Sequence, residues 1–322
     1  MIDLLNSNGK FYKANLHCHT IVSDGGMTPE QVKDYYQKHG YSIVAFTDHN
    51  EFVLHDDLKD ANFLPIAGFE ADFHILTKEG VPSRLRTCHL NFFAKNPENA
   101  VQLPEPVIYH HSLINGYIKD MVDNGWLCML NHPTWSLQPT DEVVAIDNIT
   151  AMEVYNHGCQ VLSNNGDSQG YFASYLASGK KAFATATDDN HCALLEDGLP
   201  GGDDDACGGY IMISMKDFSY ESFIDSFERG RFYASTGVEI KELYIDEQAD
   251  ELVISCSPVK AITIKGTTYL SIPNVYSRKD DITSARMPMN RIRKLCKGFF
   301  RVEFLTSDGK RAYSQPFYYE NK

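Results

Sequence analysis

Histidine and acidic residues recur at the ends of apolar runs along the first two thirds of the chain. The first such run ends in His17-Cys18-His19 and is followed closely by Asp24. In an extended strand, residues i and i+2 point to the same side, so the two imidazoles can aim at one point. Five further signals follow apolar runs of their own: Asp48-His49, Glu70, His89, His132 and Asp188-Asp189-Asn190-His191. Together these signals predict a multinuclear metal site built from strand ends.

The distribution of histidine supports this interpretation. All 12 histidines lie at or before position 191. A single histidine is more often a core or surface residue than a ligand, and four histidines without a preceding strand are expected at the surface: His39, His55, His110 and His111. His74 and His157 lie a few residues beyond candidate ligands, so contact with a ligand or with substrate is an alternative to a structural role.

Strand and helix patterns alternate from residue 13 to about residue 190. The clearest helix begins at Thr28-Pro29-Glu30-Gln31, where Thr28 and Gln31 can form a capping box, and it ends before Gly40. The other predicted strands cover 42–47, 64–69, 86–93, 127–130, 150–155 and 182–187, and the other helices cover 113–124, 170–178 and 220–229. This alternation, with polar residues at the carboxyl ends of the strands, is typical of a βα barrel.

The pattern changes near residue 239 to short alternating strands. Examples are 251–256, 261–265 and 299–304, and Ser307-Asp308-Gly309-Lys310 is a hairpin signal. We therefore expect two domains: an α/β barrel over residues 1–238 and a small all-β sandwich over residues 239–322.

Composition narrows the cellular context and the partners. The formal net charge of −14 is concentrated before residue 239, which argues against sequence-independent binding of long nucleic acid. The eight cysteines form no CxxC pair, and several lie in apolar runs, as expected for reduced core residues. No secretory signal and no run of 18 apolar residues is present, so we expect a cytoplasmic protein without a membrane partner. The oligomeric state stays open.

The ordered motifs HxH, SDG, TDHN, GxE, H, NHP and DxH resemble the polymerase and histidinol phosphatase (PHP) superfamily of metal-dependent phosphoesterases, over residues 13 to about 237. The resemblance implies a distorted (β/α)7 TIM-like barrel with two or three divalent metal ions, usually zinc, iron or manganese. Matched residue by residue, it implies three ligand sets: His17, His19 and Asp189 for one metal, bridging Glu70 with His89 and His132 for the second, and Asp24, His49 and His191 for the third.

The chemistry of these residues agrees with the resemblance. Histidine-rich ligation with some carboxylates suits Zn²⁺, Fe²⁺ or Mn²⁺ better than Mg²⁺. Two neighbouring cations can supply hydroxide at neutral pH, and the hydroxide can attack phosphorus in line. We expect Glu70, Asp24 and His191 to take part in catalysis directly. Some family members have His in place of Asp24, which changes the charge at the third metal.

Several assignments have alternatives. Either carboxylate of the pair Asp188-Asp189 could be the ligand, and the DxH spacing favours Asp189. Arg84 and Arg86 could clamp a substrate phosphate or belong to a solvated hairpin. Asn156, with Glu153 and Tyr155, closes a predicted strand, and these residues could bind substrate in the pocket, serve in the core or support the metal ligands.

The leading functional hypothesis is an enzyme that hydrolyses a small phosphorylated metabolite or nucleotide by means of a metal-bridging hydroxide. An exonuclease or oligonucleotide phosphodiesterase is an alternative, because it would use the same metals. It would also need a groove that extends beyond the pocket. A non-catalytic, metal-binding regulatory PHP module is the third hypothesis. The presence of every expected ligand type argues against the non-catalytic module.

Overall fold

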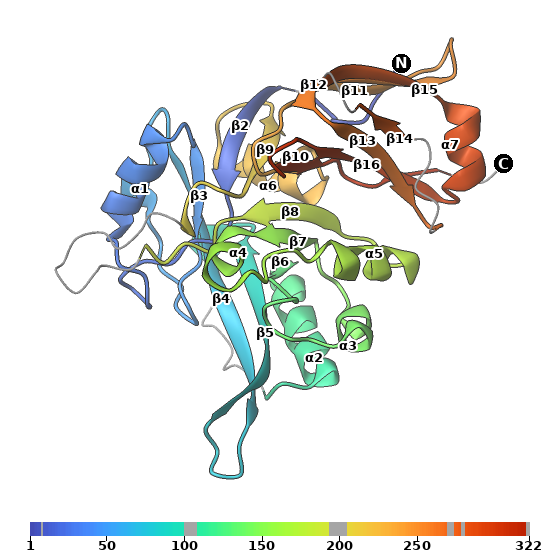
Figure 1. Cartoon of the computed structure of the whole chain (residues 1–322). Helices are drawn as coiled ribbons and strands as arrows, with labels where there is room; N and C mark the ends of the chain where they lie inside the picture. The colour runs from blue at the N-terminus through green and yellow to red at the C-terminus, as the bar shows by residue number, and fades with distance from the viewer. Residues whose placement is uncertain (8, 100–107, 193–204, 269–273, 278–280, 320–322) are drawn as a thin grey trace.

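The computed structural model describes residues 1–7, 9–99, 108–192, 205–268, 274–277 and 281–319. Within these residues one large mixed sheet of 14 strands extends through the molecule (Figure 1). Its strands in the first part of the chain are β2 (Lys10–Asn15), β3 (Ile43–Phe46), β4 (Leu64–Leu76), β5 (Pro82–Ala94), β6 (Trp126–Leu130), β7 (Ala151–Asn156), β8 (Phe183–Thr187), β9 (Tyr210–Met215) and β10 (Phe232–Ser235).

The order of neighbouring strands in this region is β10-β9-β2-β3-β4-β5-β6-β7-β8. β2, β3 and β4 are parallel, and so are β6, β7 and β8. β5 is antiparallel to both of its neighbours, and β9 is antiparallel to β2. The sheet is therefore mixed, whereas the strands of a βα barrel are all parallel.

The prediction of a distorted (β/α)7 TIM-like barrel is confirmed only as a mixed α/β fold, because the described residues show no closed barrel. β8 lies beside β9 and β10 in space, but within the described residues it forms no hydrogen-bonded ladder with them, so the sheet stays open. The connection between β4 and β5 is only a short turn at 77–81, and parallel strands need a much longer crossover. β4 and β5 instead form a long hairpin that projects from the body of the molecule (Figure 1).

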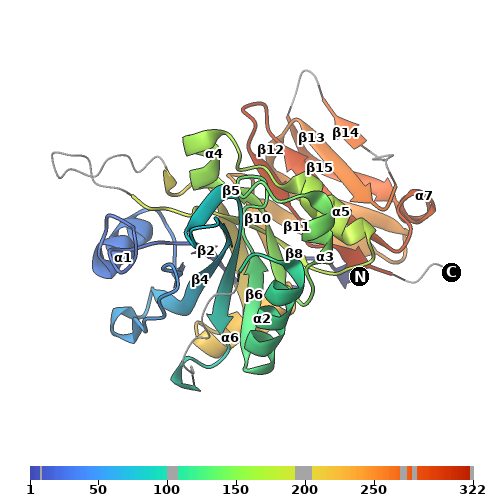
Figure 2. The same ribbon diagram turned by 90° about the horizontal axis from the view of Figure 1, so that it is seen from below.

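Seven α-helices connect or cover these strands in the described part of the chain: α1 (Pro29–Lys38), α2 (His111–Asp123), α3 (Thr140–Ala145), α4 (His157–Ser163), α5 (Gln169–Ala177), α6 (Tyr220–Glu228) and α7 (Met289–Leu295), with 3-10 turns at Asp56–Leu58 and Pro97–Asn99. The predicted capping box of α1 is confirmed, because Thr28 Oγ1 accepts from the Gln31 amide and the Gln31 side chain accepts from the Thr28 amide. α2, α3 and α5 lie together on one side of β6 and β7 (Figures 1 and 2).

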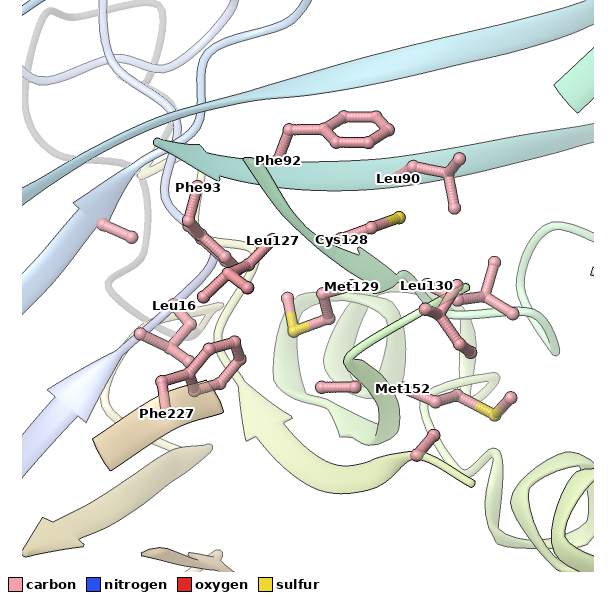
Figure 3. Packing of buried hydrophobic residues seen from close by; sticks show 14 of the residues in the cluster. Leu16, Leu90, Phe92, Phe93, Leu127, Cys128, Met129, Leu130, Met152 and Phe227 are labelled. Carbon is pink, nitrogen blue, oxygen red and sulfur yellow. The ribbon is translucent and has the colours of Figure 1, made fainter. Parts of the chain in front are cut away.

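The main core lies between the sheet and these helices. All five residues of β6 are buried, and Met129 and Leu130 pack near Met152 of the neighbouring strand (Figure 3). Phe93 of β5 and Phe227 of α6 belong to the same cluster. This packing fixes the strands whose ends carry the polar signals. No helix among the described residues is both long and apolar enough to span a membrane.

The C-terminal region forms a two-layer β-sandwich with its own core. One layer contains β1 (Ile2–Asp3), β11 (Ile240–Asp246), β12 (Glu251–Val259) and β15 (Ile282–Pro288). The other is the end of the large sheet, with β13 (Ala261–Gly266), β14 (Asn274–Tyr276), β16 (Phe299–Leu305), β17 (Arg311–Tyr313) and β18 (Phe317–Tyr318). Ile254, Ile264 and Val302 are among the residues buried in its core.

The sandwich is joined to the rest of the molecule through the sheet. β17 pairs with β10, so the large sheet continues from one region into the other. The side chain of Gln315 also accepts from the amide of Ala184 at 2.7 Å and donates to its carbonyl at 2.9 Å. The first residues of the chain pair with β11 in the sandwich. The division into two domains near residue 238 stays a prediction. The strand pairings and hydrogen bonds described above connect the two regions on either side of it.

Candidate metal centre

The order of strands in the sheet brings the polar signals together. His17 and His19 follow β2, His49 follows β3, and His132 follows β6. Asp189 and His191 lie just beyond β8, next to the segment after β2 through a bridge between Cys18 and Asn190. Glu70 and His89 differ from the expectation, because they lie inside the long strands β4 and β5 and not at their ends. Their side chains still reach the same cluster.

The tightest group of donor atoms consists of His17, His19, Glu70 and Asp189. The Nε2 atoms of His17 and His19 are 3.1 Å apart, and each is 3.1 Å from Asp189 Oδ1. The Glu70 oxygens lie 3.2 Å from His17 Nε2 and 3.3 Å from His19 Nε2. Four ligands arranged tetrahedrally about 2.0–2.1 Å from a zinc ion would be about 3.3–3.4 Å apart. The observed spacing is close to that of such a site.

A second group extends from Glu70 toward β5 and β6. His89 Nδ1 is 3.1 Å from Glu70 Oε1, and His132 Nε2 is 3.5 Å from the same oxygen. His132 Nε2 is also 3.6 Å from Asp189 Oδ2. The Glu70 carboxylate therefore lies between the two groups, where a bridging ligand would have to lie.

A third, looser group lies at the mouth of the site around Asp24, whose side chain is about half exposed. Its carboxylate is 3.5 Å from His191 Nε2, 3.6 Å from His19 Nδ1 and 3.9 Å from His49 Nε2. These distances exceed those of the first group. The mouth is thus the more open and less tightly defined part of the cluster.

The cluster contains buried polar atoms with no hydrogen-bond partner. Within the described residues these atoms are His19 Nδ1, His49 Nδ1, Glu70 Oε2 and His89 Nε2. Buried polar groups in proteins are nearly always paired, and a buried carboxylate needs a compensating cation. Within the described residues neither Glu70 nor Asp189 has a Lys or Arg partner, so histidines are the only ionisable basic groups beside their charges. The donor set therefore fits divalent cations.

The electrostatics of the metal-free cluster agree with this. Burial by itself lowers the pKa of His19, but Asp189 and Glu70 outweigh it and raise that pKa to about 9. Burial alone would raise the pKa of Glu70, yet the surrounding histidines hold it well below its usual value. Protons on the histidines thus compensate the carboxylates when no metal is bound, and metal binding must displace them.

Glu153 of β7 positions the ligands from behind. Its Oε1 accepts from His17 Nδ1 at 2.7 Å and from the Thr187 hydroxyl at 2.6 Å. Its Oε2 accepts from the His132 amide at 2.8 Å and from the Asn156 side chain at 2.9 Å. All four contacts are buried, and the first leaves the lone pair of His17 Nε2 directed at the cluster. The only sequence signal for this role was an acidic residue inside an apolar strand.

The two neighbouring aspartates point to different places. Asp189 faces His17 and His19, as given above, whereas the Asp188 oxygens accept from three backbone amides at 207–209 and from the Tyr36 hydroxyl. β8 ends at Thr187, where the predicted strand over 182–187 also ends, so the two aspartates lie beyond the strand, and Asp189 has a positive φ of 53°. His132 also has a positive φ, of 21°, so two cluster residues lie in backbone conformations that cost energy.

The three residues expected to bind substrate, Asn156, Arg86 and Arg84, lie in different surroundings. Asn156 is fully buried, and its amide donates to Glu153 and to Asp189 Oδ2 while its oxygen caps α4, so it positions Asp189 and has no exposed atom for substrate. Arg86 forms an ion pair with Glu142 at 2.7 Å. Arg84 has no ion-pair partner in the described part of the chain and lines a cleft beside the cluster.

Two adjoining cavities give access to the site. A pocket of about 200 Å³ lies directly over the cluster and is bordered by Glu70, His132 and Asp189, among others. A larger cleft of about 880 Å³ runs beside it along the β4–β5 hairpin. Trp135 borders both, and its side chain is 40% exposed. Sequence reasoning missed Trp135, although it lies only three residues after His132.

The remaining histidines lie outside the cluster. His39, His110 and His111 are exposed, as predicted, whereas His55 is half-buried with its ring against Phe46. His74 lines the cleft, and its Nε2 lies 2.9 Å from Asp72 Oδ2. His157 is hydrogen-bonded to Tyr155 and borders a separate cavity.

Several solved structures are similar to this chain at low sequence identity. A two-domain protein from Bacteroides vulgatus ATCC 8482, described as containing a PHP-like metal-dependent phosphoesterase, is 15% identical with a TM-score of 0.48 and covers 98% of this chain and 97% of its own. A protein described as a metal-dependent phosphoesterase, from Bifidobacterium adolescentis ATCC 15703, is 14% identical with a TM-score of 0.39, over 59% and 93% of the two chains.

A third structure is an amidohydrolase from Chromobacterium violaceum with bound sulfate and no metal, which is 13% identical with a TM-score of 0.37 over 58% and 89% of the chains. No curated protein matches the chain. A family model described as "PHP domain" matches residues 15–199, which is more than half of the sequence and includes every candidate ligand. The chain therefore belongs to the PHP domain family.

Proposed function

We propose that the protein is a hydrolase that cleaves a phosphate ester of a small metabolite or nucleotide with the help of two or three divalent metal ions. One observation carries the proposal. Glu70 joins two groups of donor atoms at the floor of an accessible pocket, and several of these atoms have no hydrogen-bond partner within the described residues. A purely structural metal site is normally closed, whereas a catalytic site keeps open positions.

We assign the ligands as the family resemblance implies. His17, His19, Glu70 and Asp189 would hold one metal, Glu70 with His89 and His132 a second, and Asp24, His49 and His191 a third. When bound, such ions lower the pKa of a water molecule and offset negative charge on the phosphoryl group. Zinc, iron and manganese all suit this donor set.

The chain's own residues prepare the site for that chemistry. Glu153 holds the proton of His17 on Nδ1, so Nε2 stays free to bind. Asn156 donates to Asp189 and fixes the direction of its carboxylate. At the mouth, Asp24 faces His191 and helps to raise its pKa against the effect of burial. With the third position empty, His191 Nε2 would hold a proton for the leaving oxygen.

The cleft provides room for the rest of the substrate. Its volume of about 880 Å³ lies in the range of small-molecule sites, and it is contiguous with the metal pocket through Asp24, His49, His89 and Trp135. Arg84 lines the cleft but not the pocket, so it would contact the leaving group or a second anionic group rather than the reacting phosphate. A short oligonucleotide would also fit an open cleft, which keeps phosphodiester cleavage as the second candidate.

A substrate panel with metal-reconstituted protein tests the proposal. We expect turnover of at least one class among alkyl phosphomonoesters, nucleoside monophosphates, phosphodiesters and short oligonucleotides. Glu70→Gln should lower both metal content and turnover by orders of magnitude, because it removes the shared anionic ligand. Glu228→Gln, at a surface ion pair with Lys95, is the matched control and should change neither.

The outcomes separate the candidates. Turnover of diesters or oligonucleotides alone would replace the leading proposal with the phosphodiesterase. A fully metal-loaded protein that cleaves no ester in the panel would contradict both and favour a non-catalytic module.

A further inference from the structure

We propose that Trp135 is a stacking platform for a planar ring in the alcohol portion of the substrate, so that the enzyme prefers phosphate esters of alcohols that carry an aromatic ring. The proposal rests on the phosphoesterase function proposed above and specifies its substrate class. It assigns a specificity-determining role to a residue that is not a metal ligand.

The position of Trp135 is the first argument. Its ring lies 5.0 Å from the ring of His132 at an interplanar angle of 76°, and 5.7 Å from that of His89 at 64°. Both histidines belong to the metal cluster. Trp135 borders the metal pocket and the cleft together, so a substrate that extends from a phosphate in the pocket into the cleft can contact this ring.

The exposure of Trp135 is the second argument. The other tryptophan, Trp126, is 1% exposed in the core, whereas Trp135 leaves 40% of its surface in contact with solvent. Leu85 and Leu137 line the same cleft and are 72% and 61% exposed. Large apolar side chains gathered in a concave surface commonly mark a ligand site. A ligand ring placed there would remove this apolar surface from water.

The edge contacts of the indole explain why a ring is favoured over an aliphatic group. The histidine rings are tilted steeply against Trp135, which holds the indole in a defined plane. An aromatic group gains an additional stacking interaction with such a surface beyond the area that it buries. A saturated group of the same size would gain only the burial.

The test compares three phosphomonoesters of primary alcohols: benzyl phosphate, cyclohexylmethyl phosphate and ethyl phosphate. Their leaving groups have similar basicity, so differences in rate report on binding of the side group. With the metal-loaded protein we expect kcat/KM for benzyl phosphate to exceed that for cyclohexylmethyl phosphate by about tenfold. Trp135→Ala should remove this difference by raising KM for the benzyl ester, whereas Trp135→Phe should keep most of it.

Controls distinguish a substrate contact from support of the metal cluster. If Trp135 only supports His132 and His89, Trp135→Ala will lower kcat for all three esters alike, which would overturn the proposal. Leu113→Ala, which removes a 49% exposed side chain on α2 that lines neither the cleft nor the metal pocket, should change nothing. Turnover with no preference for the benzyl ester would also overturn the proposal while leaving the phosphoesterase function intact. Failure to cleave any ester would overturn both.

A binding measurement gives a readout independent of turnover. The chain has two tryptophans, so the emission of Trp135 can be separated from that of buried Trp126 by comparison with Trp135→Phe. The non-hydrolysable benzylphosphonate should change the emission of the wild-type, metal-loaded protein and not that of Trp135→Phe. Ethylphosphonate should bind more weakly. Equal affinity for both phosphonates would contradict the stacking role.

Discussion

At the residue scale, the cluster depends on side chains that hold the ligands as well as on the ligands themselves. Glu153 and Asn156 are fully buried, and Glu153 accepts from His17 and His132 while Asn156 donates to Asp189 and to Glu153. Such outer contacts orient a ligand before the metal arrives. They also explain how His132 and Asp189 are maintained at positive φ.

Glu153→Gln should weaken metal binding although Gln has nearly the same shape. The Glu153 oxygens accept four hydrogen bonds. In Gln an amide group replaces one of these oxygens, and because it donates hydrogen bonds it cannot accept from the groups that the oxygen served. We expect metal affinity to fall by roughly 10- to 100-fold, measured by competition with a chelator. Glu228→Gln is the surface control. Unchanged affinity in Glu153→Gln would show that this carboxylate does not position the ligands.

The pKa of His19 predicts how metal stabilisation depends on pH. Against the effect of burial, Asp189 and Glu70 raise it to about 9 in the metal-free fold. Because the pKa of His19 is higher in the folded chain than in the unfolded chain, its protonation stabilises the fold. This stabilisation is fully present below the pKa of about 6.5 in the unfolded chain and is lost as the pH rises through about 9. Metal binding needs neutral histidine, so the stabilisation by metal should grow between these limits.

Thermal unfolding with and without added zinc measures this difference. The increase in Tm caused by zinc should be larger at pH 8.5 than at pH 6.5. Both values lie in the range from about 6.5 to about 9 over which the stabilisation by metal should grow. An increase that is independent of pH, or larger at the lower value, would contradict the proton displacement described above.

At the element scale, short sequence motifs predicted correctly those features that depend only on neighbouring residues. The capping box of α1 was predictable because Thr28, Pro29 and Gln31 each satisfy a specific position at the start of a helix. A solvated hairpin around Arg84 and Arg86 is one of the alternatives that the sequence offers, but the pattern predicts that the strand from residue 64 ends at residue 69, because the residues beyond it alternate polar and apolar side chains. Strand direction and sheet closure depend on distant pairings, which no local pattern contains.

The site was predictable to a greater extent than the fold. Histidine and carboxylate at strand ends identified the residues that the structure brings together, since ligand chemistry restricts residue type strongly. The outer contacts of Glu153 and Asn156 and the exposed ring of Trp135 were not predictable in this way. Their roles depend on which strands become neighbours, not on the residues beside them in sequence.

Thr28→Ala should destabilise the protein by about 1 kcal/mol, because the helix start loses the acceptor for the Gln31 amide. α1 also supplies Tyr36, whose hydroxyl donates to Asp188, so the helix is tied to the segment that carries Asp189. Urea unfolding of the wild type, Thr28→Ala and Thr28→Ser measures the effect. Thr28→Ser should retain most of the stability. Equal stability of all three proteins would show that the Thr28 side chain does not stabilise the fold by capping α1.

At the scale of the whole molecule, the two regions share one sheet. All candidate ligands lie before residue 192, so the sequence alone predicts that residues 1–238 fold and act without the sandwich. The structure shows β10 paired with β17 and Gln315 bonded to the backbone of Ala184 next to β7. Removal of the sandwich would expose the edge of β10 and the apolar side chains buried against it.

A chain truncated after residue 238 should therefore be much less stable than the full chain, or aggregate. Circular dichroism and thermal unfolding of the two purified forms provide the measurement. If the truncated chain unfolds at the same temperature as the full chain and binds the same metal, the links across the boundary contribute little, and the sandwich is an independent domain.

The central claim is that the cluster binds several metal ions, and metal stoichiometry tests it most directly. Elemental analysis of the reconstituted protein should give at least two equivalents of transition metal per chain. His89→Ala and His132→Ala should each lower the value by about one equivalent, as expected for the loss of one ligand at the second position, whereas His111→Ala at an exposed site should not. Less than one equivalent in the wild type after reconstitution would contradict the claim.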